Sequence, residues 1–443
     1  MTGGGTAAPR RGLVGGALAT IAVRGIDLPS RYGFHLLVAA SLGVEQAGRF
    51  YIVYSAVTAL SGLGRVGLDR ALTRRLAVAL AHDDTRQIRP LLLRGMALVS
   101  ALSLLAGLLL YAGAPLLART LLGKPALIEP LRLAALILLP QNLSTLMAGA
   151  LAGLHRVGQS QMIYSWLWPS LFCAVALVTG LTLPGALLLM ALAFLTATLI
   201  GAVLLVRALP AAHDAPHPAL PTRAHGLMHD GMAMFSLEMT QLLIAAAPVL
   251  ILGMLADSRA VGLFSLAWRV ALMVNIVVSG IAAMASPRYA ALHAKNQAAD
   301  LNRAAAQAIG LSLLLTLPAV AVMLAVPAPL LGMFGHGFAD GADVLRILAL
   351  GQILAAASAS MPDLLGMTGH RTALRRLNLV SLTVLLLGTL ALAHFWSAAG
   401  TAWAVSLSIA VNGLGALILA RRDLGLAPWR ALTARLLKRK ATA

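Results

Sequence analysis

The sequence predicts an all-α polytopic membrane protein with about 12 transmembrane helices, in two six-helix lobes related by an internal repeat around a central cavity. Hydrophobic residues make up 59% of the 443 residues and charged residues only 11%, whereas about 25% of residues are charged in soluble domains. The mean hydropathy is +0.86. Long apolar segments recur along the whole chain, and the second half repeats features of the first.

A helix needs about 20 consecutive apolar residues to cross a bilayer, and apolar segments of nearly this length recur throughout the sequence. They cover about residues 14–41, 50–68, 91–112, 131–151, 162–180, 184–206, 232–254, 261–286, 305–326, 344–365, 377–395 and 400–420. We expect each to form one membrane-spanning helix.

The first segment is apolar but contains four ionisable residues, Arg24, Asp27, Arg31 and His35. At about 100° per residue they occupy one face of a helix, within an arc of about 80°. Charges at bilayer depth are costly on a surface that faces lipid, so we expect this face to line a wet interior. Pro29 lies among them, and it predicts a kink or a short unwound turn.

A proline-rich connection near the middle of the chain divides the spans into two sets of six. The predicted organisation is an N-terminal lobe (1–207), a cytoplasmic linker (208–230), a C-terminal lobe (231–420) and a basic tail (421–443). An offset of 214 residues places Gly48 on Gly262, Phe50 on Phe264 and Arg24 on Glu238. Two parallel copies predict an axis along the membrane normal, with Arg24 and Glu238 facing each other across the central cleft.

The basic residues between the spans predict the orientation of the chain, because Lys and Arg accumulate in cytoplasmic loops. Of the 34 Lys and Arg residues, 25 lie on the side that carries both termini, Arg65 among them, and only 4 on the opposite side. Both termini should therefore be cytoplasmic. The net charge of +19 follows from these loops, so we do not expect nucleic acid as a partner.

The ionisable residues within the spans are the candidate functional residues. Arg24, Arg31 and Arg269 form a cationic set that suits an anionic ligand, and guanidinium groups bind phosphate oxygens in pairs. Asp27 is expected to be a counter-ion, and His35 or Glu238 to couple transport to an ion.

Other motifs predict no enzymatic chemistry. The chain has no GxxxxGK[ST] loop, and the GxGxxG match at residues 62–67 lies at the end of a span, where small residues favour helix packing. Cys173 is the single cysteine, so no intrachain disulfide forms. We expect no metal site and no cofactor.

Several short motifs are similar to those of a known family: Gly48-Arg49-Phe50-Tyr51, Gly67-Leu68, and Val261-Gly262-Leu263-Phe264 with Trp268-Arg269. The chain resembles the polysaccharide-transport, O-antigen-flippase branch of the multidrug/oligosaccharidyl-lipid/polysaccharide (MOP) exporter superfamily.

That resemblance implies a flippase, not an enzyme, in the bacterial inner membrane. It would move a polyprenyl-diphosphate-linked oligosaccharide, for lipopolysaccharide or exopolysaccharide synthesis, by alternating access. Its partners would be the lipid-linked glycan, membrane lipids, and glycan polymerase or chain-length-control proteins of the same pathway. Arg24, Arg31 and Arg269 would bind the diphosphate in the cavity.

Two other functions are alternatives. A multidrug exporter of the same superfamily would take organic cations and would need a net acidic, aromatic cavity. An integral-membrane glycosyltransferase or polymerase would need a catalytic acid in a sizeable periplasmic loop, and the predicted periplasmic segments are short.

The bias in Lys and Arg yields a test of the predicted topology. Reporter fusions after Leu80, Ala219 and Thr442 should report the cytoplasm, and a fusion after Leu122 the periplasm. A periplasmic signal at Ala219 would contradict the division into six and six spans.

Overall fold

The computed structural model describes residues 11–82, 84–209 and 226–429, without the side chains of 11–25, 28, 233, 236 and 237. This described part is helical and contains no strand. Its α-helices are α1 (Arg11–Arg65), α2 (Leu68–Ala81), α3 (Ile88–Leu116), α4 (Ile128–Gly153), α5 (Val157–Gln161), α6 (Leu167–Thr179), α7 (Leu183–Ala208), α8 (Leu227–Leu255), α9 (Ser258–Ala294), α10 (Ala298–Ala325), α11 (Pro327–Gly332), α12 (Ala342–Ala357), α13 (Met361–Met367) and α14 (Arg371–Leu424).

Ten helical segments of the described chain are long and apolar enough to cross a membrane. The two longest helices, α1 and α14, each contain one residue with non-helical dihedral angles, Gly43 in α1 and Ser397 in α14. Each of these helices therefore consists of two arms and holds two of the predicted spans. The predicted all-α membrane fold is confirmed.

The break in α1 differs from the prediction in its position. We expected a kink or a short unwound turn at Pro29, but the backbone of α1 stays helical through Pro29 and is interrupted at Gly43, where φ is 69° and ψ is 175°. A positive φ is readily adopted only by glycine, whereas a proline in a helix costs one hydrogen bond and need not unwind the backbone. The helix resumes directly after Gly43, so the second span begins before residue 50.

The described residues divide into two compact units. The first contains the chain up to Ser41, Val57–Arg119 and Lys124–Met239, and the second contains Leu42–Ala56, Thr120–Gly123 and the chain from Thr240 onward. The lobe limits 1–207 and 231–420 stay a prediction, and the greater part of the predicted linker, 210–225, lies outside the described residues.

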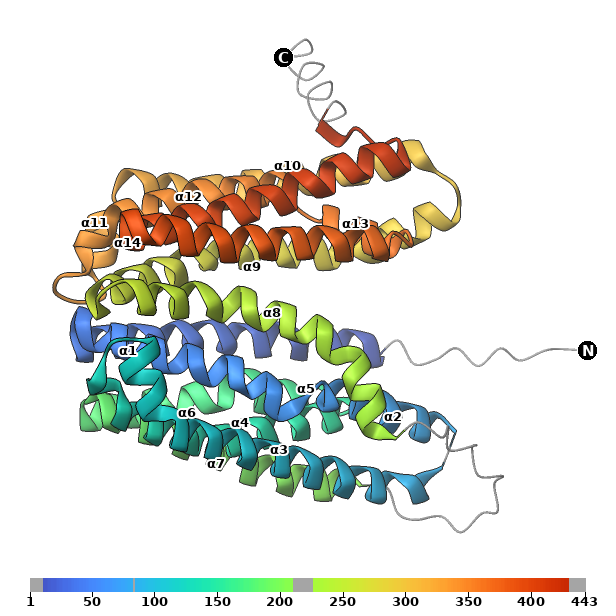
Figure 1. The fold of residues 1–443 in the computed structure, drawn as a ribbon. Coiled ribbons are helices and arrows are strands. Elements are labelled where there is room, and N and C mark those ends of the chain that lie inside the picture. Colours follow the sequence, from blue (N-terminus) through green and yellow to red (C-terminus); the bar gives the residue numbers. More distant parts are fainter. Residues whose placement is uncertain (1–10, 83, 210–225, 430–443) are drawn as a thin grey trace, which may run out of the picture. The chain divides into compact units, whose positions relative to one another are not determined.

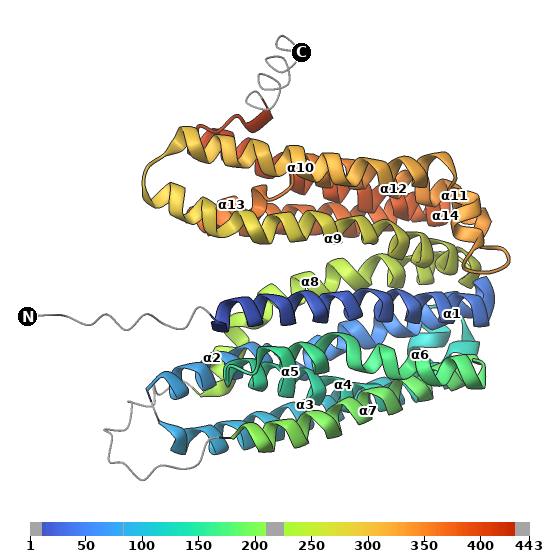
Figure 2. The same ribbon diagram turned by 180° about the vertical axis from the view of Figure 1, so that it is seen from behind.

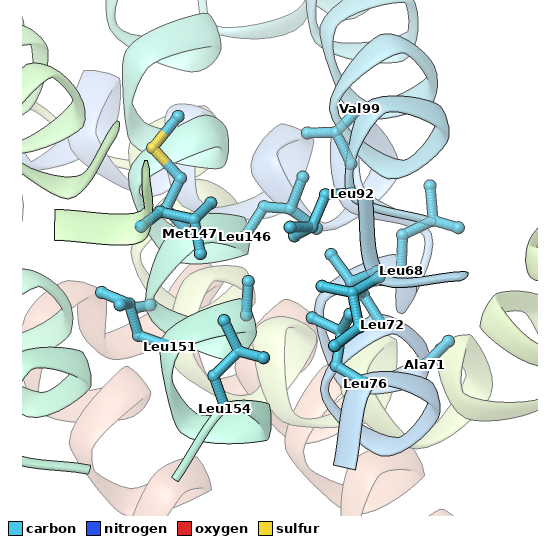
Figure 3. Close-up of a cluster of buried hydrophobic side chains, with 14 of the residues drawn as sticks. Leu68, Ala71, Leu72, Leu76, Leu92, Val99, Leu146, Met147, Leu151 and Leu154 are labelled. Carbon is cyan, nitrogen blue, oxygen red and sulfur yellow. The ribbon is translucent and has the colours of Figure 1, made fainter. Parts of the chain in front are cut away.

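In the first unit, α4 packs against α2, α3 and α7, and Figures 1 and 2 show these helices side by side. The short helix α2 is amphipathic. Leu68, Leu72 and Leu76 recur at every fourth residue and pack into a buried apolar cluster with residues of α3 and α4 (Figure 3). Arg70 and Arg74 lie on its exposed face. This packing holds α2 in place directly after the end of α1.

In the second unit, α9, α10 and α12 pack against one another, and α12 also packs along α14. The buried residues of α9, α10, α13 and α14 form one apolar cluster. Many leucines on outer faces of both units are exposed, for example Leu108 of α3 and Leu387 of α14. In a membrane protein such residues face lipid.

A close contact in the second unit reflects the internal repeat. A Cβ atom on Gly48 would lie 1.7 Å from the carbonyl oxygen of Ser258, and one on Gly262 would lie 2.1 Å from the carbonyl oxygen of Val44. Gly48 and Gly262 are related by the 214-residue offset, and so are Val44 and Ser258. The contact is therefore reciprocal, as a local two-fold axis requires.

We predict that Gly262→Ala and Gly48→Ala each destabilise the protein by about 1–3 kcal/mol or more, because backbone atoms must move to admit the methyl group. Thermal unfolding of the purified protein in detergent measures the effect. Gly280→Ala is the control, since Gly280 lies in the same helix as Gly262 with nothing within 4 Å of its added Cβ. Equal stability of the Gly262 and Gly280 variants would contradict the close contact.

Candidate ion-pair and cationic sites

The predicted ionisable face of the first span is partly described. Asp27 accepts a hydrogen bond of 2.7 Å from Arg31 Nε, one helical turn away. The Arg31 side chain is 45% exposed, so its remaining N–H groups are accessible. His35 is buried beside the ring of Phe34. The side chain of Arg24 is not among those that the structure describes.

Arg269 lies in an aromatic environment within the second unit. Its guanidinium carbon is 5.7 Å from the ring centroid of Tyr51 and 5.3 Å from that of Tyr54. Both distances are in the range of cation–π attraction, which is stronger where water is excluded. Arg269 Nε is buried and has no hydrogen-bond partner. The guanidinium group is thus held by rings rather than by a carboxylate.

Glu238 has a partner that the sequence did not predict. Its Oε1 accepts a hydrogen bond of 2.5 Å from Arg65 Nη2, and the two side chains are only 7% and 9% exposed. Both residues belong to the first unit. That Arg24 faces Glu238 stays a prediction, because the side chain of Arg24 is not described. Arg65, which we counted with the cytoplasmic loops, is instead in the last turn of α1, where burial forces its charge to be neutralised.

A polar cluster surrounds the guanidinium group of Arg65. Its Nη1 donates to Asn142 Oδ1 at 3.1 Å and to Ser61 Oγ at 3.4 Å, and Asn142 Nδ2 donates to Ser103 Oγ at 2.9 Å. Gly64 makes room for this cluster, because a Cβ there would lie 2.3 Å from Asn142 Nδ2. The GxGxxG segment therefore serves close helix packing, as predicted.

A second contact near the ion pair fixes the beginning of α8. A Cβ on Gly67, which has φ +68°, would lie 2.5 Å from the carbonyl oxygen of Gly231. Arg75 Nε donates to Asp230 Oδ2 at 2.7 Å. Residues 231 and 238 are two helical turns apart on one face of α8. The start of α8 is thus bound to the end of α1 and to α2 through three separate contacts.

The ion pair borders a partly open cavity of about 230 Å³ within the first unit. Asp69, from the first turn of α2, and Tyr164, from the π-helical turn η4 (Met162–Trp166), line it together with Arg65 and Glu238. Burial raises the pKa of the Asp69 carboxyl above its ordinary value; the Arg65 guanidinium opposes this shift and the Glu238 carboxylate adds to it. Turns of the π type are frequent at functional sites.

Several proteins of known structure share the fold of this chain. One similar solved structure is an inward-facing multidrug resistance MATE family transporter of the MOP superfamily, with 16% identity and a TM-score of 0.72 over 91% of this chain and 98% of that one. Another is the lipid II flippase MurJ in an inward closed conformation, with 11% identity and a TM-score of 0.71 over 95% of this chain and 92% of that one. A MOP superfamily transporter from Pyrococcus furiosus, whose binding pocket of reverse polarity suggests a different function, matches at 16% identity with a TM-score of 0.63 over 92% and 94%. At these identities the likeness shows the fold.

The helical fold, together with two family models that match the sequence, identifies the chain as an integral-membrane transporter of the MOP superfamily. The family model described as polysaccharide biosynthesis protein matches residues 13–293, and the chain belongs to that family. A second model, MatE, matches residues 234–389. No curated protein sequence matches the chain significantly.

We predict that Glu238→Leu destabilises the protein by about 3–5 kcal/mol, because it leaves the Arg65 charge buried without its partner. The double variant Arg65→Met/Glu238→Leu should cost less than the two single variants combined, since no lone charge remains. Unfolding in detergent measures the coupling. The same cycle on the exposed pair Arg303 and Asp300 is the control, and its coupling should be below about 1 kcal/mol. A coupling no larger at the buried pair would contradict this account.

Proposed function

We propose that this transporter is a flippase that moves a polyprenyl-diphosphate-linked oligosaccharide across the bacterial inner membrane by alternating access. The observation that carries the proposal is the match of the polysaccharide biosynthesis family model to residues 13–293. The match to MurJ, itself a lipid II flippase, is a fold-level likeness in the same direction. O-antigen, other lipopolysaccharide glycan or exopolysaccharide precursors are the proposed cargo, and glycan polymerase and chain-length-control proteins the proposed partners.

The state of Arg269 supports a role in binding the diphosphate. Within the described residues no carboxylate pairs with its guanidinium group, which is held against Tyr51 and Tyr54. A guanidinium group keeps its charge and can bind two phosphate oxygens at once. The aromatic rings orient the group without neutralising it, so its charge is available to an anion.

We assign Arg31 and Arg24 to the same task. Arg31 uses Nε to bind Asp27 and retains exposed N–H groups, which suits a residue that binds phosphate while Asp27 acts as its counter-ion. Arg24 is assigned from its position on the same helical face. For His35 and Glu238 we propose a role in ion coupling, and the environment of Glu238 is developed below.

A multidrug exporter is the second candidate, because the MatE model matches residues 234–389 and MATE transporters share the fold. Such a transporter binds organic cations, which an unneutralised Arg269 would repel. The third class, an integral-membrane glycosyltransferase or polymerase, lacks comparable support, since the matched folds are those of transporters and flippases.

We predict that Arg24→Ala, Arg31→Ala and Arg269→Ala each abolish export of the surface glycan while the amount of protein in the membrane stays near normal. The Lys variants should retain part of the activity, because lysine keeps the charge and loses the two-pronged geometry. Surface glycan and the lipid-linked intermediate in the inner leaflet are measured in a strain that lacks the wild-type gene.

Arg346→Ala is the matched control. Arg346 is an exposed arginine that pairs with Asp343 one turn away, and its loss should leave export unchanged. Wild-type export by all three alanine variants of the cationic set would refute the assigned phosphate binding. Loss of resistance to organic cations on deletion of the gene, with normal surface glycan, would favour the multidrug exporter instead.

A further inference from the structure

The cavity beside Arg65 brings two carboxyl groups together with one buried guanidinium group. Arg65, Asp69 and Glu238 line it, and so does Arg70, whose side chain is exposed. The buried Arg65 group therefore faces two carboxyl groups, while the exposed Arg70 charge is screened by water. Glu238 is 5% exposed, and a charge at such depth requires a partner.

Each carboxyl group at this cavity has one buried oxygen without a hydrogen-bond partner: Oε2 of Glu238 and Oδ1 of Asp69. The other oxygen of Glu238 is occupied by Arg65. Nearly all buried polar atoms in native proteins are satisfied, so each exception needs an explanation. Two unpartnered carboxyl oxygens beside one buried guanidinium group point to a small positively charged ligand.

A metal ion fits this site poorly. Hard cations take about six or more oxygen ligands, and the described residues contain no group of three His, Cys, Asp or Glu side chains that could hold a metal. The Asn142 carbonyl oxygen already accepts a hydrogen bond from Arg65, and the guanidinium charge beside the carboxyl groups would repel a metal ion. A proton needs only one carboxylate oxygen and removes one charge.

We propose that Asp69 and Glu238, beside Arg65, form a proton-binding site that holds one exchangeable proton on a carboxyl oxygen. A hydronium ion gives up this proton to the carboxylate and leaves as water, and the reverse step releases it. Water reaches the cavity past Arg70 and Tyr164, which are both exposed. The proposal deepens the transporter function and does not depend on which cargo is carried.

The charged and titratable groups around Asp69 come from each neighbouring element. Arg65 comes from α1, Arg70 from α2 itself, Tyr164 from η4 and Glu238 from α8; the α4 residues at the cavity, Thr145, Ala148 and Gly149, carry no charge. The raised pKa of Asp69, caused first by burial, agrees with this arrangement. The cations of Arg65 and Arg70 lower the pKa of Asp69, and the anion of Glu238 raises it.

The consequence of protonation follows from the contacts of α8. The ion pair between Glu238 and Arg65 is one of the three contacts that hold the start of α8. A proton on Glu238 would weaken that bond, whereas a proton on Asp69 would leave the Arg65 charge wholly to Glu238 and strengthen it. The position of one proton thus sets how firmly the start of α8 is attached.

Infrared difference spectroscopy of the purified protein in nanodiscs tests the proposal. Wild-type protein should show a protonated-carboxyl C=O band that persists above about pH 5, where exposed carboxyl groups are ionised. Asp69→Asn or Glu238→Gln should abolish the band and so identify the carboxyl that holds the proton. Both substitutions preserve shape, and Gln can still accept the hydrogen bond from Arg65.

Asp230→Asn is the matched control, because Asp230 pairs with Arg75 in the same unit but is partly exposed. It should leave the band unchanged. Arg65→Lys should keep the band, because lysine keeps the charge. Arg65→Gln should move the midpoint of the pH titration of the band to higher pH by about 1 unit or more, because the cation that favours the carboxylate is lost.

A wild-type spectrum without such a band, or a band unchanged in both carboxyl variants, would overturn the proposal. Loss of the band in Asp230→Asn would also overturn it. The measurement needs no glycan, so its outcome is independent of the proposed cargo: a titrating band together with normal surface glycan after gene deletion would refute the flippase assignment and leave the proton site standing.

Discussion

The structure of the first unit depends on one constraint: a charge that lies among apolar helices must be neutralised where it lies. Arg65 ends a membrane-spanning arm of α1, and Glu238 begins the span Glu238–Leu255. Neither position can be occupied alone, because an isolated buried charge costs several kcal/mol. The pair ties the end of α1 to the start of α8. Gly64 leaves room for the side chain of Asn142, and Gly67 for the backbone of α8 at Gly231.

Two arginines at membrane depth illustrate two different ways of holding a guanidinium group. Arg65 is bound by a carboxylate and amide and hydroxyl oxygens, so its charge is used within the protein. Arg269 lies against Tyr51 and Tyr54, which orient it but leave the charge unneutralised. We therefore propose a structural and ion-coupling role for the first and the binding of an external anion for the second.

The reciprocal contact of Gly48 and Gly262 shows how a weak sequence repeat becomes a precise structural one. Each glycine admits a carbonyl oxygen from the residue four positions before the other glycine. Phe50 and Phe264, which the same offset relates, are both fully buried. Lipid-facing positions tolerate any apolar residue, so the repeat need not persist there. Positions where backbones touch or where a large side chain is buried are more constrained, and there the repeat is visible.

The sequence by itself determined the fold class, the spans and the cationic candidates. Hydropathy is a property of consecutive residues, and a bilayer permits few backbone structures other than helices. It did not determine which charges meet. Arg65 and Glu238 are separated by 173 positions in the chain, and Arg65 looked like one more loop arginine until the packing of α2 against α3 and α4 placed it in the interior. Asp69 gave no signal either, since its unpartnered oxygen and the cavity beside it exist only where α1, α2, α4 and α8 come together. Pairing of distant charges is decided by tertiary packing, because burial rather than residue type makes a charge need its partner.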